Sequence, residues 1–357
     1  MQLKAVISIC KILDLFDAKW PVILKNFCLY IVLIVVFISC QRTETPIVSF
    51  YYWKTNFNLS PLELETIKEN NVEKIYIRYF DLDLHPKTKQ VYPVSPIHFT
   101  KLPNITSIVP VVYIQNKVML DQNFNSQDLA NKTNDFINLI NTKNKLSCQE
   151  IQIDCDWTLS SKTNYLKFIE DFKRISAKKL SATIRLHQVK YFEKTKIPNV
   201  DSGVLMYYNM GTIAVKSLNS IYDQGIAKRY IKSLKKYPLP LSYALPIYSW
   251  GIHISQGKVI GLRSKLLASD LDSSANFTFI KKNIYRVNQS HYRKGVFYKK
   301  EDVIKIEAIS ADDLKEMASD LKENGASSPK EIIFYDLDEL NLINYEKTIF
   351  KQVVTCF

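Results

Sequence analysis

The chain has 357 residues and an ordinary globular composition, 46% hydrophobic and 23% charged, so its length allows one large domain or two smaller ones. Glycine is scarce, at 8 residues, which excludes collagen-like and glycine-rich disordered chains. The formal net charge is +13, but no helix-turn-helix, zinc-finger or RNA-recognition signature accompanies it. We therefore expect no nucleic-acid partner.

The first forty residues are typical of an export signal. Residues 27–39 form a continuous apolar run of 13 residues, and four lysines precede it. This run matches the apolar core of a signal peptide and is shorter than the about 20 residues of a membrane span. Cys40 follows in the tail Phe37-Ile38-Ser39-Cys40, which is similar to a loose bacterial lipobox. We expect residues 1–40 to be a signal peptide and Cys40 to carry a lipid.

The alternative is an uncleaved anchor helix that begins near Val22. Either signal predicts that residues 41–357 are exported and anchored to a membrane of the bacterial cell envelope.

The rest of the chain gives no indication of a metal or cofactor. The leader carries a net charge of +2, which leaves +11, spread as lysines along predicted helices and loops. Such a charge suits anionic glycans or lipid headgroups. Cys148, Cys155 and Cys356 are an odd set without CxxC spacing, and no HExxH motif is present, so we expect no disulfide framework, no metal site and no cofactor.

Past residue 40, short β-rich runs alternate with helical patterns, which predicts βαβ units and a parallel sheet. The predicted strands are 47–53, 72–80, 107–114, 150–157, 179–187, 203–210, 241–250 and 331–337. The predicted helices are 60–70, 129–141, 165–175, 218–236 and 342–354, and Pro198 weakens the helical pattern after the fifth strand. Eight strands with mostly helical crossovers predict an α/β fold, a (β/α)8 barrel of the TIM type over residues 41–357. A doubly wound open sheet is the alternative, but no glycine-rich phosphate loop follows the first strand.

Residues 255–330 are too many for a plain loop between the seventh and eighth strands. They contain β-like runs at 277–287, 295–298 and 303–306 and a helical pattern at 311–322. We therefore expect an inserted α+β segment there.

The fourth strand carries the strongest signal for chemistry, because active sites of such barrels lie at the carboxyl ends of the strands. Alternation points Asp154 and Asp156 toward the barrel axis and Cys155 and Trp157 toward the helices. Two carboxylates on successive inward positions are costly to bury. We interpret them as functional; the alternative is a structural polar layer.

Other strand ends supply candidate partners. The fifth strand places Arg185 and His187 on one face, where Arg185 can pair with an aspartate, either as part of a site or as a buried ion pair. The second strand offers Arg78 and then Asp81 and Asp83, which can also simply cap a loop.

The last three strands add aromatic and polar residues. Tyr208 and Asn209 end the sixth strand, Tyr248 and Trp250 end the seventh, and Asp336 lies at the end of the eighth. Aromatic rings at strand ends suit stacking on sugar rings and equally suit packing. Asp336 is placed to reach the barrel mouth.

Together these motifs resemble family 18 glycoside hydrolases, the chitinase-like barrels. Asp154-Cys155-Asp156-Trp157-Thr158 resembles that family's Asp-x-Asp-x-Glu motif, Met206-Tyr207-Tyr208-Asn209 its Met-x-Tyr-Asp motif, and Leu245-Pro246-Ile247-Tyr248 its Leu-Pro-x-Tyr turn. Many members also carry an insertion after strand seven. The run 151–156 is also similar to an uncharacterised bacterial family of exported barrel lipoproteins.

The chain departs from the family at two positions. Thr158 stands where the family has the glutamate that protonates the leaving oxygen, and Asn209 stands for its aspartate. Threonine cannot donate a proton usefully near neutral pH.

Three functions therefore stay open. The first is a glycosidase that uses other carboxylates, with Asp154, Asp156 and Asp336 as catalytic candidates and Asp81 or Asp83 as alternatives. The second is an inactive, lectin-like barrel, and the third is an envelope scaffold. In the first two, a glycan is the partner, and the expected substrate-binding residues are Arg78, Arg185, His187, Tyr208, Asn209, Tyr248 and Trp250. In the lectin-like barrel, Tyr208, Tyr248 and Trp250 would form the platform, with Asp154 and Arg185 as structural polar groups.

Overall fold

The computed structural model describes residues 45–214, 219–272 and 274–357. The predicted leader with Cys40, and the first residue of the predicted helix 218–236, lie outside the described residues.

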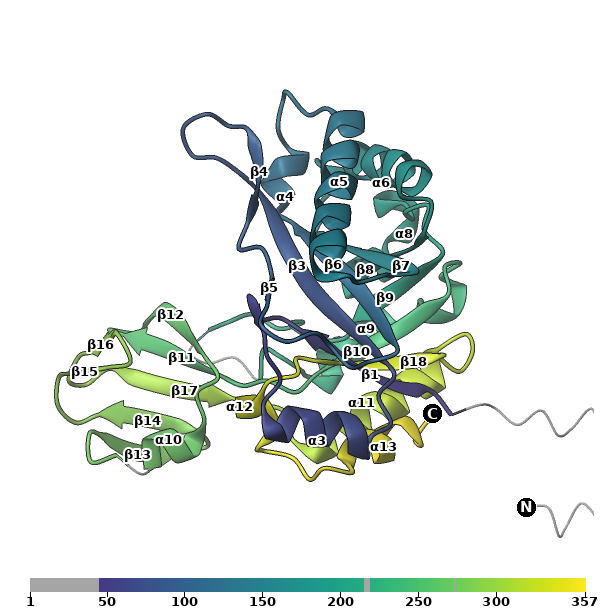
Figure 1. Cartoon of the computed structure of the whole chain (residues 1–357). Coiled ribbons are helices and arrows are strands. Elements are labelled where there is room, and N and C mark those ends of the chain that lie inside the picture. Colours follow the sequence, from purple (N-terminus) through teal and green to yellow (C-terminus); the bar gives the residue numbers. More distant parts are fainter. Residues whose placement is uncertain (1–44, 215–218, 273) are drawn as a thin grey trace, which may run out of the picture. The chain divides into compact units, whose positions relative to one another are not determined.

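Eight parallel strands close into a barrel (Figure 1). The barrel strands are β1 (Ile47–Tyr52), β3 (Lys74–Leu84), β6 (Ser107–Ile114), β7 (Glu150–Asp154), β8 (Lys179–Arg185), β9 (Ser202–Met206), β10 (Leu241–Pro246) and β18 (Glu331–Tyr335). Each strand pairs with its neighbours in chain order, and β1 closes the ring by pairing with both β3 and β18. The predicted (β/α)8 barrel is confirmed.

The strands are apolar along most of their length because both faces are covered. In β1, Phe50 points outward and packs on Phe350 of the carboxyl-terminal helix, with ring centroids 5.0 Å apart. Its neighbour Tyr51 points inward, and its hydroxyl donates to Gln152 Oε1 across the barrel at 2.7 Å. The alternation read from the sequence therefore gives the inside and outside of the barrel correctly.

Helices fill most crossovers. They are α3 (Pro61–Glu69), α4 (Asn116–Met119), α5 (Ser126–Asn144), α6 (Lys162–Ser176), α7 (Leu186–Lys190), α8 (Phe192–Thr195), α9 (Gln224–Ile231) with the 3-10 turn η1 (Leu234–Lys236), α11 (Ala311–Asn324), α12 (Glu339–Leu342) and α13 (Ile349–Val354). The start of α3 follows from its sequence, since Ser60 caps the helix and forms a reciprocal capping box with Glu63. No helix in the described part of the chain is long and apolar enough to cross a membrane.

The crossover from β3 to β6 contains no helix. It consists of β4 (Val91–Val94), which pairs antiparallel with the end of β3, and β5 (His98–Phe99), which pairs with β2 (Asn56–Phe57). This hairpin explains why β3 runs to Leu84, beyond the strand end predicted at residue 80.

Five predicted strands end two or more residues too late. β7 ends at Asp154, β8 ends at Arg185 so that His187 lies in α7, β9 ends at Met206, β10 ends at Pro246 and β18 ends at Tyr335. Trp250, predicted to end the seventh strand, begins the next strand, β11. The physical reason is that apolar periodicity continues through the buried mouth, whereas the parallel hydrogen-bond ladder ends where its partner strand turns away.

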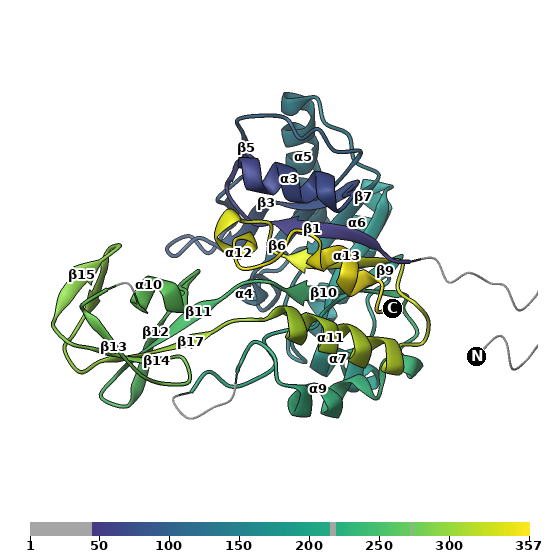
Figure 2. The same ribbon diagram turned by 90° about the horizontal axis from the view of Figure 1, so that it is seen from below.

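The inserted segment forms a second sheet with its own small core (Figures 1 and 2). Its elements are β11 (Trp250–Ser255), β12 (Lys258–Ser264), α10 (Ala268–Asp272), β13 (Phe277–Lys281), β14 (Ile284–Val287), β15 (His291–Arg293), β16 (Val296–Tyr298) and β17 (Val303–Glu307). Five of these strands form an antiparallel sheet in the order β12-β11-β17-β14-β13. The sequence placed the insertion at 255–330, but α11 packs on β10, α9 and α13 and is therefore a helix of the barrel.

Paired charges fill the amino-terminal end of the barrel. Lys74 Nζ lies 2.9 Å from Glu150 and 3.1 Å from Glu331. The Tyr76 hydroxyl donates to Glu331 at 2.9 Å, and the Ser181 hydroxyl donates to Glu150 at 2.7 Å. Each carboxylate here has both a cation and a hydroxyl donor.

Candidate functional site

The opposite, carboxyl-terminal end of the barrel is hollow. A cavity of about 500 Å³ lies there, and every barrel strand contributes to its wall near that end. It is lined by Trp53, Asp81, Tyr113, Asp154, Asp156, Arg185, Met206, Tyr208, Asn209, Tyr248, Trp250, Ser264, Lys265, Tyr335 and Asp336. Eight of the ten barrel residues predicted for the site are brought together here, and the exceptions are Arg78 and His187.

A second lobe of about 330 Å³ adjoins this cavity. The two lobes share Asp156, Arg185, Tyr208 and Asn209, and the second adds His187 on α7 and a few neighbours. Burial, and then the charge of Arg185, lower the pKa of His187, so this imidazole is neutral at pH 7. His187 is thus a neutral polar group in the side lobe.

Asp156 is held by Arg185 from the next strand. The guanidinium donates to both carboxylate oxygens, through Nε to Oδ1 and through Nη2 to Oδ2, the latter at 2.8 Å. Burial alone would lower the pKa of Arg185, but the hydrogen bonds and charge of Asp156 raise it. This two-point pair fixes the orientation of both groups and occupies both oxygens of Asp156.

Asp154 lies deeper and has no such partner. It is buried and accepts one hydrogen bond from the Thr183 hydroxyl at 2.7 Å. Burial raises the pKa of Asp154 to about 6, although the charge of Arg185 opposes the shift. This carboxyl therefore exchanges its proton near neutral pH.

Asp336 has a similar character on the opposite side of the ring of strands. It is buried, and the Asn341 side-chain amide donates to its Oδ1 at 2.6 Å. Burial raises the pKa of Asp336 to about 6, with Lys265 opposing the shift. The nearby lysines pair instead with Asp338, at 2.6 Å for Lys265 and 3.3 Å for Lys54.

The second-strand candidates divide between two places. Asp81 lines the cavity and is paired through both oxygens with Arg78, which lies behind it with its guanidinium 5.9 Å from the Trp53 ring centroid. Asp83 is paired with Lys117 at 2.6 Å and is not among the residues lining the cavity. Arg78 therefore orients Asp81, and Asp83 lies outside the cavity lining.

Aromatic rings form a continuous wall along one side of the cavity. Tyr335 contacts Trp53, Tyr208 and Tyr248 at centroid distances of 5.5, 5.6 and 5.8 Å, and Tyr248 contacts Trp250 at 5.4 Å. The sequence reasoning missed Trp53, Tyr113 and Tyr335 as site residues. Their positions at or just after predicted strand ends were the available signal.

A buried carboxylate of the insertion fixes the outer end of this wall. Glu307 on β17 accepts from the Trp250 indole N–H at 3.0 Å and from the Ser220 backbone N–H at 3.0 Å. Lys305 donates to its other oxygen at 2.7 Å. Burial alone would raise the pKa of Glu307, but these donors hold that pKa below its usual range. Glu307 thus ties the Trp250 ring to the loop after β9.

Thr158, the position that corresponds to the glutamate of the family motif, does not line the cavity. It is exposed, and its backbone N–H donates to Ser161 Oγ at 2.9 Å, just before α6. Trp157 stacks on Tyr165 of α6 with centroids 4.4 Å apart, as the predicted outward orientation requires. The chain leaves the barrel interior directly after Asp156.

Comparison with known proteins gives matches in structure only. No protein-family model matches the sequence, and no curated protein sequence matches it significantly. A class V chitinase from Nicotiana tobaccum superimposes with a TM-score of 0.50 at 11% identity, over 87% of this chain and 98% of the enzyme. A mutant of that chitinase in complex with NAG4 gives the same values.

A chitinase from Bacteroides thetaiotaomicron gives a TM-score of 0.49 at 12% identity, over 84% of this chain and 96% of that chain. At such low identity the likeness concerns the fold. The predicted chitinase-like barrel is confirmed: this chain has the fold of the family 18 glycoside hydrolases.

Proposed function

We propose that this protein binds a carbohydrate in the cavity at the barrel mouth. One observation carries the proposal: a wall of aromatic rings stands over a floor of oriented carboxylates and a guanidinium. Sugars present both apolar C–H faces, which pack on aromatic rings, and hydroxyls, which pair with such polar groups. The volume of the main lobe, about 500 Å³, lies within the usual range for small-molecule sites.

N-Acetylglucosamine oligosaccharides are the first ligands to test. A mutant of the tobacco chitinase with the same fold was solved with NAG4. The second lobe continues the cavity past Arg185 and Asn209, which gives room for more than one sugar unit.

Binding without cleavage is favoured over the family's own chemistry. Thr158 supplies no acid and does not line the cavity, and Asp156 has both oxygens engaged by Arg185. Neither group is therefore available as it would be in an N-acetyl-assisted hydrolysis.

Calorimetric titration with oligosaccharides tests the proposal. We expect at least tenfold weaker binding at the mouth in Trp250→Ala than in the wild type, because the substitution removes the outer ring of the wall. Tyr292→Ala is the matched control, since Tyr292 is 77% exposed on the insertion and does not line the cavity. Unchanged affinity in Trp250→Ala, or an equal loss in the control, would contradict the assignment.

Hydrolysis by Asp154 and Asp336 is the second candidate, favoured by their shared cavity and raised pKa values of about 6. One protonated carboxyl would give its proton to the glycosidic oxygen, while the other, ionised, took a proton from water. The water oxygen would then bond to the anomeric carbon as the glycosidic bond breaks.

Product analysis distinguishes this candidate from binding alone. Hydrolysis predicts new reducing ends with the wild-type protein and their loss in both Asp154→Asn and Asp336→Asn. Tight binding with no product at any pH from 5 to 8 would leave the binding function alone.

Export and lipid anchoring through Cys40 are also proposed, on the leader sequence alone. In a bacterial host, metabolic labelling with a fatty acid should mark the wild-type protein and leave Cys40→Ser unlabelled. A labelled Cys40→Ser variant, or an unprocessed leader in the purified protein, would contradict the lipid anchor.

A further inference from the structure

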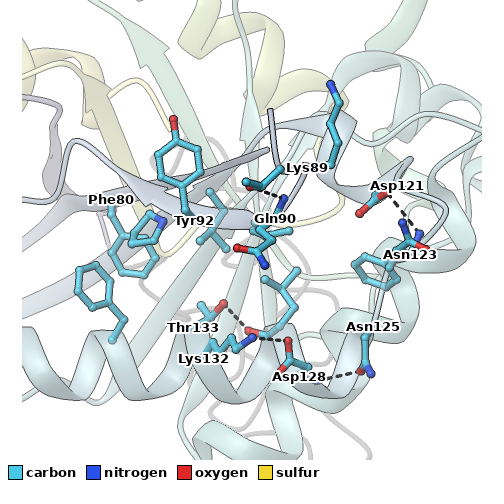
Figure 3. Close-up of a pocket in the computed structure, with 17 residues that line it drawn as sticks. Phe80, Lys89, Gln90, Tyr92, Asp121, Asn123, Asn125, Asp128, Lys132 and Thr133 are labelled. Carbon is cyan, nitrogen blue, oxygen red and sulfur yellow. Dashed lines mark hydrogen bonds and ion pairs between the residues drawn. The ribbon is translucent and has the colours of Figure 1, made fainter. Parts of the chain in front are cut away.

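A second hollow lies on the outer side of the barrel, between the β3–β4 hairpin and α5 (Figure 3). Its volume is about 430 Å³. The hollow exists because the crossover after β3 contains this hairpin in place of a helix. The helix α5 therefore covers one side of the outer face of β3 near its end, and the other side has the hairpin in place of a helix.

The floor of this groove is apolar and rigid. Phe80 and Leu82 of β3 are buried beneath it, and the Phe80 ring packs edge-on against Phe136 of α5 at 4.7 Å. Phe124, half-buried in the loop before α5, lines one end. A ligand in the groove would thus contact the aromatic and aliphatic carbon atoms of this floor.

The rim is polar and carries no net charge. Two lysines, Lys89 and Lys132, face two aspartates, Asp121 and Asp128, and Lys132 pairs with Asp128 at 2.7 Å. Side-chain amides lie between these charges: Gln90 points from the hairpin toward α5, and Asn123 stands at the other end (Figure 3).

These features select a class of ligand. An anion or a cation would gain nothing from a rim of balanced charge, and no group of three metal-binding side chains occurs in the part of the chain that the structure describes. A purely apolar ligand would cover the side-chain amides of Gln90 and Asn123 without offering them hydrogen-bond partners. A neutral saccharide satisfies both the carbon floor and the amide rim, and we propose that this groove is a second binding site for neutral saccharides.

The groove and the mouth cavity are separated by a single strand. Asp81 lines the mouth cavity, whereas its neighbours Phe80 and Leu82 line the groove on the opposite face of β3. No residue lines both hollows, so substitutions can disable either site without touching the other.

The test uses neutral oligosaccharides of the chito-, cello-, xylo- and malto- series with a protein whose mouth is disabled. In Trp250→Ala we expect residual one-to-one binding by calorimetry. Adding Gln90→Ala and Asn123→Ala should weaken this residual binding about tenfold, since two hydrogen bonds are lost. Lys87→Ala is the matched control, because Lys87 is exposed on the same hairpin and does not line the groove.

The outcomes separate this proposal from the mouth site. If Trp250→Ala removes all binding and the groove variants change nothing, the groove is not a saccharide site and the mouth proposal stands. If only the groove variants remove binding, the groove is confirmed and the mouth proposal fails. If Lys87→Ala lowers affinity as much as Gln90→Ala with Asn123→Ala, or if no neutral oligosaccharide binds, the groove proposal is overturned.

Discussion

The two ends of the barrel interior both contain buried carboxylates, but only one end pairs all of them. At the amino-terminal end, Glu150 and Glu331 share Lys74 and each receives a hydroxyl donor, and none of these three residues lines the hollows discussed above. At the mouth, Asp154 and Asp336 lack an ion pair of their own, and burial raises the pKa of each to about 6.

This difference indicates where the barrel is built for stability and where it is built for a ligand. Paired charges at the closed end hold three strands in register, whereas incompletely paired carboxyls beside a hollow cost folding free energy. In barrels of this kind the carboxyl-terminal face is the functional one. The mouth therefore carries polar groups that the fold alone does not need.

The largest expected effect comes from the closed end. Lys74→Met should lower the free energy of unfolding by about 3 kcal/mol, because it leaves Glu150 and Glu331 adjacent without their cation. Denaturant unfolding measures the loss. Lys347→Met, which breaks an exposed pair with Glu65, should cost less than about 1 kcal/mol. Equal losses in the two variants would show that the closed-end cluster does not stabilise the barrel.

At the mouth, removing a charged side chain is expected to raise the free energy of unfolding. The pKa of Asp154 is about 6 in the fold against 3.8 unperturbed, so the folded state holds a proton that the unfolded state has lost between those pH values. Stability from this group is therefore full below pH 3.8 and is lost as pH rises to about 6. Asp154→Asn should raise the free energy of unfolding by up to about 3 kcal/mol above pH 6.

The pH profile of that variant is the control. Asparagine keeps the hydrogen bond from Thr183, so the gain should vanish below about pH 4, where Asp154 is protonated in both states. A stability loss in Asp154→Asn at pH 7.5 would mean that the mouth stabilises this carboxylate as an ion, which contradicts the proposed contrast.

Features set by neighbouring residues could be predicted from the sequence, whereas features set by contacts between distant parts of the chain could not. Residues 107–114 were predicted with correct bounds because a run that is apolar on both faces ends in polar residues at each side. Asp154, Asp156 and Asp336 were placed at one end because parallel strands share that end. The raised pKa values were not predictable, since burial is supplied by residues far along the chain.

The smallest effect concerns a contact that the sequence reasoning missed. Glu307 reaches Trp250 across 57 positions of chain, and no local pattern links them. Trp250→Phe keeps a ring but removes the N–H donor, and Glu307→Ala removes the acceptor. Each should weaken oligosaccharide binding about fivefold, and the double variant should be no weaker than either single one. Additive losses would show that Glu307 does not position the Trp250 ring.

A crystal structure of the protein grown with an N-acetylglucosamine oligosaccharide would show whether the barrel mouth holds a sugar. We expect a sugar ring against the wall formed by Tyr208, Tyr248 and Trp250, with hydroxyls or the acetamido group within hydrogen-bond distance of the floor around Arg185 and Asp156. A mouth cavity without sugar at a saturating ligand concentration, or sugar bound only outside it, would contradict the proposed binding site.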